Sequence, residues 1–115
     1  MSAETVQTGR QAVEAAIQRF FHMCNTHCPG NVAPLLTPDV EFLADQAANG
    51  IDATGAYFKW LWESYPDLTF RVENMVIDGL NVAAEVSYKN GPEKDGARCF
   101  VFRMKGDLIR RIRCY

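Results

Sequence analysis

The stretch from His22 to Cys28 concentrates residue types that bind metals. It reads His22-Met23-Cys24-Asn25-Thr26-His27-Cys28. Structural zinc needs four ligands that converge on one point. In a helix that turns by about 100° per residue, His22 lies roughly 200° from Phe20, whereas Cys24 lies close to it. The spacing therefore favours a helix end with a solvent-facing histidine and a buried thiol, and we expect no metal and no other cofactor.

Two acidic residues are candidates for a catalytic base. Asp45 follows the apolar segment Val40–Ala44, and Glu85 lies in the middle of an alternating strand pattern. A carboxylate buried in an apolar pocket has a raised pKa and can exchange protons near neutral pH. Asp45 would enter a pocket if the preceding strand slipped by one residue, because such a shift reverses every side chain; otherwise it is a solvated loop acid. Glu85 would do so only if the two faces of its sheet were exchanged.

The four cysteines do not suggest a disulfide framework. They are Cys24, Cys28, Cys99 and Cys114. With Gly106 at the centre of the last hairpin, Arg98 pairs with Cys114. Cys99 then projects from the opposite face of the sheet, so these two thiols cannot bond within one chain.

Composition and charge limit the class of protein. The 115 residues are 48% hydrophobic and 23% charged, with a formal net charge of -2. This predicts one globular domain with its own core, over residues 11–115, after a flexible N-terminus over residues 1–10. Nucleic acids and anionic membranes select basic surfaces, so we expect neither as a partner. No apolar run approaches a membrane span and no signal peptide is recognisable, so we expect a soluble cytoplasmic protein.

Apolar residues recur at helical spacing near the N-terminus. They predict a helix from about Thr8 to about Asn25, ended by Cys28-Pro29-Gly30. Val32–Leu36 then predicts a short second helical turn, and Val40–Ala44 a first strand.

A later helical segment is unusually aromatic. Residues 45–53 are predicted to form a loop, after which Thr54 could cap a helix from Gly55 to about Ser64. The large apolar residues of this segment are Tyr57, Phe58, Trp60, Leu61, Trp62 and Tyr65. Since they cover several sides, the helix must meet more than one apolar surface, such as a sheet plus a ligand or a second subunit.

Three hairpin signals divide the last half of the chain into four strands. The turns are Asp78-Gly79-Leu80-Asn81, Gly91 to Gly96 and Lys105-Gly106-Asp107, where glycine supplies the positive φ of tight turns. Hairpins centred on these turns, with a bulge near Glu73-Asn74, make an antiparallel meander. Alternation then assigns to the helix-covered face Phe70, Val72, Met75, Ile77, Val82, Ala84, Val86, Tyr88, Arg98, Phe100, Phe102, Met104, Leu108, Arg110, Ile112 and Cys114.

The opposite face of this meander is mixed in character. It carries Ala83, Glu85, Ser87, Cys99, Val101, Arg103, Ile109, Arg111, Arg113 and Tyr115. Such a face is too apolar for plain solvent and too charged for a core. We therefore expect a homodimer formed sheet to sheet through Glu85, Val101, Arg103, Ile109 and Arg111, with Glu85 available to pair with either arginine.

Three segments together resemble the SnoaL-like branch of the nuclear transport factor 2-like superfamily. They are Leu36–Phe42, Gly55–Leu68 and Phe102–Tyr115, in that order, within a resemblance that runs from about Ala12 to Tyr115. The resemblance implies an α+β, ketosteroid isomerase-like and cystatin-like fold. Its curved antiparallel sheet, a four-stranded meander plus a short first strand, wraps around about three N-terminal helices. The result is a cone with an apolar pocket at its wide end.

The family's catalytic positions can be matched to this chain one at a time. Ketosteroid isomerases, which this chain resembles, use a tyrosine, a carboxylate base and a second acid. The matching positions here are Phe20, Ala44 and Phe100, which are all apolar. Epoxide hydrolase-type members use an arginine and two acids. The arginine falls on Arg98, which is retained, but the acids fall on Phe100 and Cys114. The resemblance therefore implies the fold without the usual catalytic acids.

The resemblance also implies which side chains line the pocket. We predict Phe20, Ala44, Tyr57, Phe58, Trp60, Trp62, Val86, Tyr88, Phe100, Phe102, Ile112 and Cys114. The favoured function is binding of a small hydrophobic ligand. The alternative is an isomerase, cyclase or epoxide hydrolase-like enzyme that acts on a hydrophobic polycyclic or terpenoid-like substrate through Asp45 or Glu85.

Overall fold

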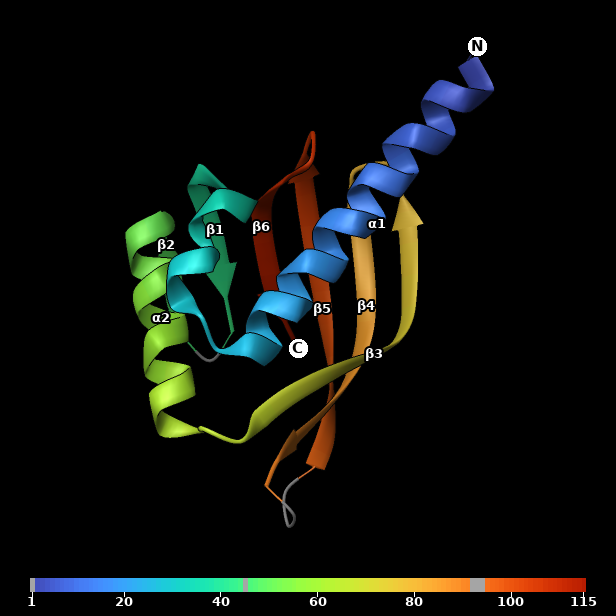
Figure 1. Ribbon diagram of the computed structural model, residues 1–115. Coiled ribbons are helices and arrows are strands. Elements are labelled where there is room, and N and C mark those ends of the chain that lie inside the picture. The colour runs from blue at the N-terminus through green and yellow to red at the C-terminus, as the bar shows by residue number, and fades with distance from the viewer. Residues whose placement is uncertain (1, 45, 92–94) are drawn as a thin grey trace.

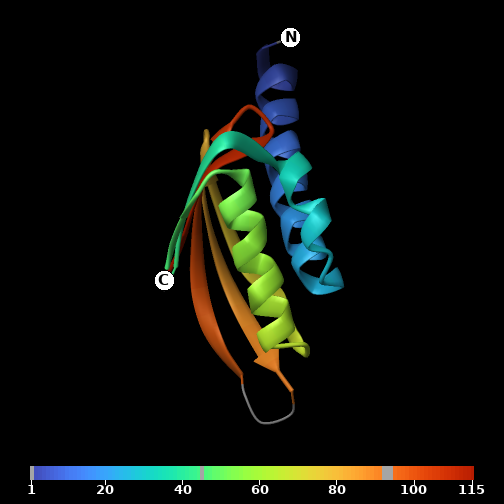
Figure 2. The ribbon, with the colours of Figure 1, turned by 90° about the vertical axis from the view of Figure 1, so that its left-hand side faces the viewer.

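Helices cover one face of a curved sheet and leave the other face open (Figures 1 and 2). The computed structural model describes residues 2–44, 46–91 and 95–115, without the side chains of residues 2–8 and 29. In those ranges the helical elements are α1 (Ser2–Thr26), α2 (Ile51–Ser64) and two short 3-10 turns, η1 (Pro29–Asn31) and η2 (Ala33–Leu35). The strands are β1 (Leu36–Leu43), β2 (Ala47–Asn49), β3 (Leu68–Asp78), β4 (Asn81–Asn90), β5 (Asp95–Lys105) and β6 (Leu108–Cys114).

The sheet is mixed rather than wholly antiparallel. Its strand order is β2-β1-β6-β5-β4-β3, in which β3 to β6 form the predicted meander. Strand β1 pairs in parallel with β6, Phe42 opposite Ile112. The expectation of a purely antiparallel sheet was wrong at this point, because β1 and β6 are far apart in sequence and no hairpin dictates their direction.

Two helical predictions need correction. Helix α1 begins at Ser2 instead of Thr8, and the expected third helix consists only of the turns η1 and η2. Helix α2 begins at Ile51, so that the expected loop 45–53 contains strand β2 and the first turn of the helix. Gly50, with φ of 89°, takes the N-cap position. Thr54 is fully buried within the helix and does not cap it.

The first hairpin and its bulge were predicted correctly. Gly79 has φ of 60°, and the register between β3 and β4 shifts between Val72 and Asn74, which leaves Glu73 as the bulged residue. In the second hairpin Val86 pairs with Arg98 on the helix-covered side, as the alternation requires. Residues 92–94 of its turn lie outside the described ranges.

The last hairpin has a register that differs from the predicted one. Phe100, not Arg98, pairs with Cys114, and a second bulge lies between Arg103 and Met104. Met104 therefore pairs with Ile109, whose side chain is 0% exposed. Ile109 belongs to the core and cannot be part of an outer interface.

The same bulge moves Leu108 and Arg110 out of the predicted alternation. Arg110 has no cross-strand partner in the ladder, and its guanidinium reaches two acids on β1 instead: Nε lies 3.5 Å from Oδ2 of Asp39, and Nη1 lies 3.6 Å from Oε1 of Glu41. The hydroxyl of Thr37 and the Arg110 guanidinium hold the pKa of Asp39 below its usual value. The bulge thus buries an isoleucine and leaves an arginine with acidic partners.

The core lies between α1, α2 and the sheet. The ring of Phe20 lies 5.2 to 6.4 Å, centre to centre, from the rings of Phe21, Phe58, Phe100 and Phe102, mostly edge to face. These rings come from both helices and from β5, so they join the two layers. In the part of the chain that is described, no helix is long and apolar enough to cross a membrane.

Candidate ligand-binding site

A cavity of about 460 Å³ lies between α2, the end of α1 and the helix-covered face of the sheet. Its inner wall is apolar: Cys24, Phe42, Phe58, Leu68 and Phe100 are all buried residues that line it. Burial raises the pKa of the Cys24 thiol far above neutrality. This thiol is therefore protonated and a poor nucleophile.

Helix α2 supplies an aromatic rim to the cavity. Tyr57, Trp60 and Tyr65 line it, and the indole of Trp60 lies 5.8 Å from the Tyr57 ring and 6.3 Å from the Tyr65 ring. Trp60 is 49% exposed, which is unusual for so large an apolar residue. Phe58 on the same helix faces the core rings. The helix therefore meets two apolar surfaces, the core on one side and the cavity on the other.

The far end of the cavity is polar. It is lined there by Tyr88 and Asn90 of β4 and by Asp95 and Arg98 of β5. Tyr88 stands opposite Gly96, and a Cβ atom placed on Gly96 would come within 2.5 Å of the Tyr88 hydroxyl oxygen. The phenol thus lies directly over the glycine, next to Arg98. Arg98 is half-buried, and no hydrogen bond or ion pair joins its guanidinium to another described residue.

Seven of the predicted pocket residues border this cavity. They are Ala44, Tyr57, Phe58, Trp60, Tyr88, Phe100 and Cys114. They come from α2 and from four different strands or strand ends. Sequence reasoning missed nine lining residues: Cys24, Phe42, Leu61, Tyr65, Leu68, Phe70, Asn90, Asp95 and Arg98. Of these, Phe70 and Arg98 had been placed on the helix-covered face of the sheet, and Leu61 and Tyr65 on the aromatic helix, without being assigned to the pocket.

The other five predicted residues lie elsewhere. Phe20, Val86, Phe102 and Ile112 are at most 1% exposed and belong to the closed core, where α1 covers the sheet. Trp62 is also buried, stacked on Phe58 on one side and on His27 on the other, with ring centres 5.3 and 5.5 Å away. Strand alternation identifies a face but not which part of it a helix covers.

Glu85 is not a base in this cavity. It is exposed on the outer face of the sheet, where the Asn74 side-chain amide donates to its Oε1 at 3.1 Å. The faces of β4 were therefore assigned correctly, and Glu85 does not point to the helix-covered side as the alternative required. Asp45 lies outside the described residues, although its neighbour Ala44 borders the cavity.

The cluster from His22 to Cys28 serves the end of α1. His22 is exposed and Cys24 is buried, as the helical spacing predicted. His27, with φ of 56°, stacks on Trp62, and its Nε2 hydrogen-bonds with the carbonyl oxygen of Leu68. The imidazole thereby joins α1 to α2 and to the start of β3, next to the cavity.

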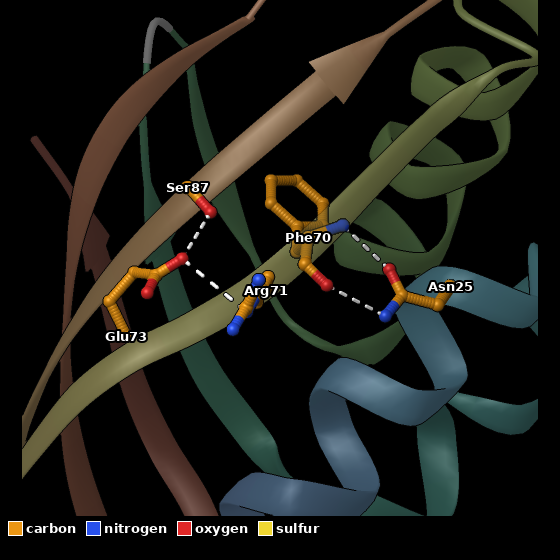
Figure 3. A network of polar contacts seen from close by, with 5 residues as sticks. All are labelled: Asn25, Phe70, Arg71, Glu73 and Ser87. Carbon is orange, nitrogen blue, oxygen red and sulfur yellow. Dashed lines mark hydrogen bonds and ion pairs between the residues drawn. The ribbon is translucent and has the colours of Figure 1, made fainter.

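Asn25 fixes the wall strand β3 in a second way (Figure 3). Its Nδ2 donates to the carbonyl oxygen of Phe70 at 2.8 Å, and its Oδ1 accepts from the Phe70 amide at 2.7 Å. Since β3 is the last strand of the sheet, these backbone groups face no further strand. On the other side of β3, Glu73 accepts from Ser87 at 2.7 Å and lies 3.6 Å from Arg71.

Solved structures with the same fold carry different assignments. A protein from a Jannaschia species, provisionally assigned as a SnoaL-like polyketide cyclase, is 20% identical, with a TM-score of 0.81 over 91% of this chain and 85% of its own. An uncharacterised cystatin-fold protein from Novosphingobium aromaticivorans is 13% identical, with a TM-score of 0.80 over 90% and 97%. A protein from Kribbella flavida, provisionally assigned as a ketosteroid isomerase, is 18% identical, with a TM-score of 0.78 over 90% and 76%. At these identities the likeness shows a shared fold, not a shared activity.

The sequence itself matches one family. No curated protein matches it significantly. Residues 17–112 match the SnoaL-like domain, and this range includes both the α2 rim and the β5 wall of the cavity. The chain therefore belongs to the SnoaL-like domain family.

Proposed function

We propose that this domain binds a small hydrophobic molecule in the cavity between α2 and the sheet. The observation that carries the proposal is the half-exposed aromatic rim over an apolar cavity of about 460 Å³. Ligand sites for small molecules commonly enclose about 300 to 1,000 Å³ and combine apolar walls with a few polar groups. A bound molecule would cover Trp60 and Tyr65, which water contacts in its absence.

The chemistry of the wall supports binding more than catalysis. Among the lining residues that are described, Asp95 is the one carboxylic acid, and it is exposed at the polar end. Phe100 and Cys114 occupy the positions at which relatives were expected to keep acids. An isomerase, cyclase or hydrolase reaction would therefore depend on Asp45. If the protein turns over a hydrophobic substrate, Asp45→Asn abolishes that turnover and leaves binding intact.

A cavity-filling variant tests the binding proposal. Ala44 is half-buried against the cavity, so Ala44→Phe places a ring inside it. Ala47 on β2 is exposed, and Ala47→Phe adds the same ring outside. We expect hydrophobic probes to quench or shift tryptophan fluorescence in the wild type and in Ala47→Phe, and to lose at least about tenfold in affinity with Ala44→Phe.

Native mass spectrometry of the purified protein supplies the complementary measurement, because a co-purified ligand adds a discrete mass. Equal probe affinity in Ala44→Phe and the wild type, with both variants folded by circular dichroism, would show that binding does not use this cavity.

We also propose that two copies associate through the outer face of the sheet. One row of residues crosses this face from strand to strand: Leu43, Arg113, Val101, Ala83 and Val76. Leu43 and Val76 are 48% and 57% exposed, so most of this row is apolar and accessible. Such an exposed apolar band is a common feature of homodimer surfaces.

The charges beside this row suggest how two copies fit together. Arg103 and Arg111 form a pair on one side of it, and Glu85 lies on the other side. A two-fold axis along the row brings the arginines of each copy over the acidic side of its partner. An axis parallel to the strands would instead oppose arginine to arginine.

A further inference from the structure

We infer that the molecule bound in the cavity carries a single negatively charged group, such as a carboxylate, at the end where Arg98 lies. This inference rests on the proposed function and adds the chemical class and orientation of the ligand. The polar lining residues lie together on the adjoining ends of β4 and β5, whereas the rest of the lining is mainly apolar. This arrangement suits an amphipathic acid better than a neutral hydrocarbon.

Arg98 lies on the side of the sheet that faces the cavity. It pairs with Val86, which is buried, and it shares the helix-covered face with Phe100. Its side chain therefore leaves the sheet on the cavity side. A half-buried guanidinium has lost part of its hydration, and that loss is normally offset by hydrogen bonds or an opposite charge.

The guanidinium of Arg98 has no compensating partner among the described residues. Three other arginines of the sheet have partners: Arg103 donates to Oδ1 of Asn81 at 2.9 Å, and Arg71 and Arg110 lie beside acids. Arg111 and Arg113 of β6 also have no such partner among the described residues, but they do not border the cavity. For Arg98 the described residues supply no such partner, and Asp95, which borders the same cavity, lies beyond ion-pair distance. The guanidinium keeps its full set of donors for a ligand.

Arg98 has polar neighbours that also line the cavity. Tyr88 lies on β4, two residues beyond Val86, the cross-strand partner of Arg98. Its hydroxyl lies over Gly96 on the cavity side of β5. Asn90 lies further along the same strand and also borders the cavity. A phenol, an amide and a guanidinium can all donate to one anionic oxygen pair. Asp95 is the opposing charge at this end, but its exposure to water weakens its effect.

A matched pair of fluorescent probes tests the inference. Anilinonaphthalene sulfonate and N-phenylnaphthylamine have the same ring system, and only the former carries an anionic group. We expect the wild type to bind the sulfonate at least about tenfold more tightly, because a charge-assisted hydrogen bond contributes about that factor. We expect this preference to shrink as salt is raised, since Arg98 is only half-buried.

Three variants assign the preference to Arg98. Arg98→Met removes the charge while keeping the length of the chain, so it should abolish the preference by weakening sulfonate binding alone. Arg98→Lys should retain most of it. Arg71→Met removes an exposed arginine from the outer face of the sheet and should change neither affinity.

Each outcome bears on a different claim. An undiminished preference for the sulfonate in Arg98→Met would overturn the inference and leave the proposed function standing. Failure of both probes to bind, or binding that Ala44→Phe does not weaken, would overturn the proposed function itself. Probe binding in Ala44→Phe distinguishes the cavity from a second site. Arg98 also borders a hollow of about 300 Å³ on the outer face, which Ala44→Phe leaves unchanged.

Discussion

At the scale of single residues, aromatic side chains divide into two groups with different roles. Phe20 is fully buried and touches rings from α1, α2 and β5. Trp60 projects from α2 with about half of its surface exposed, at the edge of the cavity. Sequence alone assigned both to the pocket. The structure instead places Phe20 in the core, where it stabilises the fold, and Trp60 at the candidate site.

Truncating these two residues should therefore have opposite consequences. Phe20→Ala removes a ring from a closed core, and we expect it to lower the free energy of unfolding by about 3 to 5 kcal/mol. Trp60→Ala should change it by less than about 1 kcal/mol but weaken binding of hydrophobic probes. Urea denaturation followed by circular dichroism measures the first effect, and probe titration the second. A small loss of stability in Phe20→Ala would mean that this ring borders open space.

At the scale of elements, the cavity depends on how α1, α2 and β3 are held together. Asn25 occupies the open backbone groups of the edge strand β3, and His27 links α1 to Trp62 and Leu68. Both contacts lie beside the wall of the cavity. A polar side chain that satisfies an edge strand also protects it from pairing with another molecule.

The two glycines of the α2 region give a second test at this scale. Gly55 lies within the helix, and a Cβ atom there would meet nothing within 4 Å. We expect Gly55→Ala to stabilise the protein by about 0.5 to 1 kcal/mol, because alanine loses less backbone entropy on forming a helix.

Gly50 at the helix start has φ of 89°, and Gly50→Ala should destabilise the protein by about 1 kcal/mol or more, since this φ is unfavourable for an L-residue. Thermal melts of both variants beside the wild type measure the two shifts. Equal shifts in the same direction would contradict the helix start at Ile51.

At the scale of the whole molecule, helices cover one face of the sheet and leave the other face open (Figure 2). The corrected register matters for this surface. Ile109 is buried, so the apolar contribution to the proposed dimer comes from Leu43, Val76 and Val101. These residues belong to three different strands, which makes the surface a product of the assembled sheet.

Exchanging charges across the outer face tests the dimer. Arg103→Glu places an acid where the partner's acidic side should lie, so we expect a shift from dimer to monomer in light scattering coupled to size-exclusion chromatography. Glu85→Arg should act in the same way. The double variant restores opposite charges and should recover the dimer. A wild type that remains monomeric at high micromolar concentration would refute the arrangement.

The four-stranded meander, its turns at Gly79 and Gly106 and the bulge at Glu73 could be read directly from the sequence. They depend on alternation and on turn chemistry, which act over a few residues. The same is true of the buried Cys24 and the exposed His22 near the end of α1. Local geometry is enough for these features, because neighbouring residues impose it.

The parallel pairing of β1 with β6, the bulge that buries Ile109 and the division of one apolar face into core and cavity required the tertiary structure. Each depends on segments that are distant in the chain, where no turn dictates direction or register. Phe100 and Phe102 alternate correctly, yet only Phe100 borders the cavity, because α1 covers the sheet around Phe102. In the same way, the pattern placed Arg98 on the inner face, but only the assembled sheet and helices show that it stands at a cavity with its charge uncompensated by the described residues.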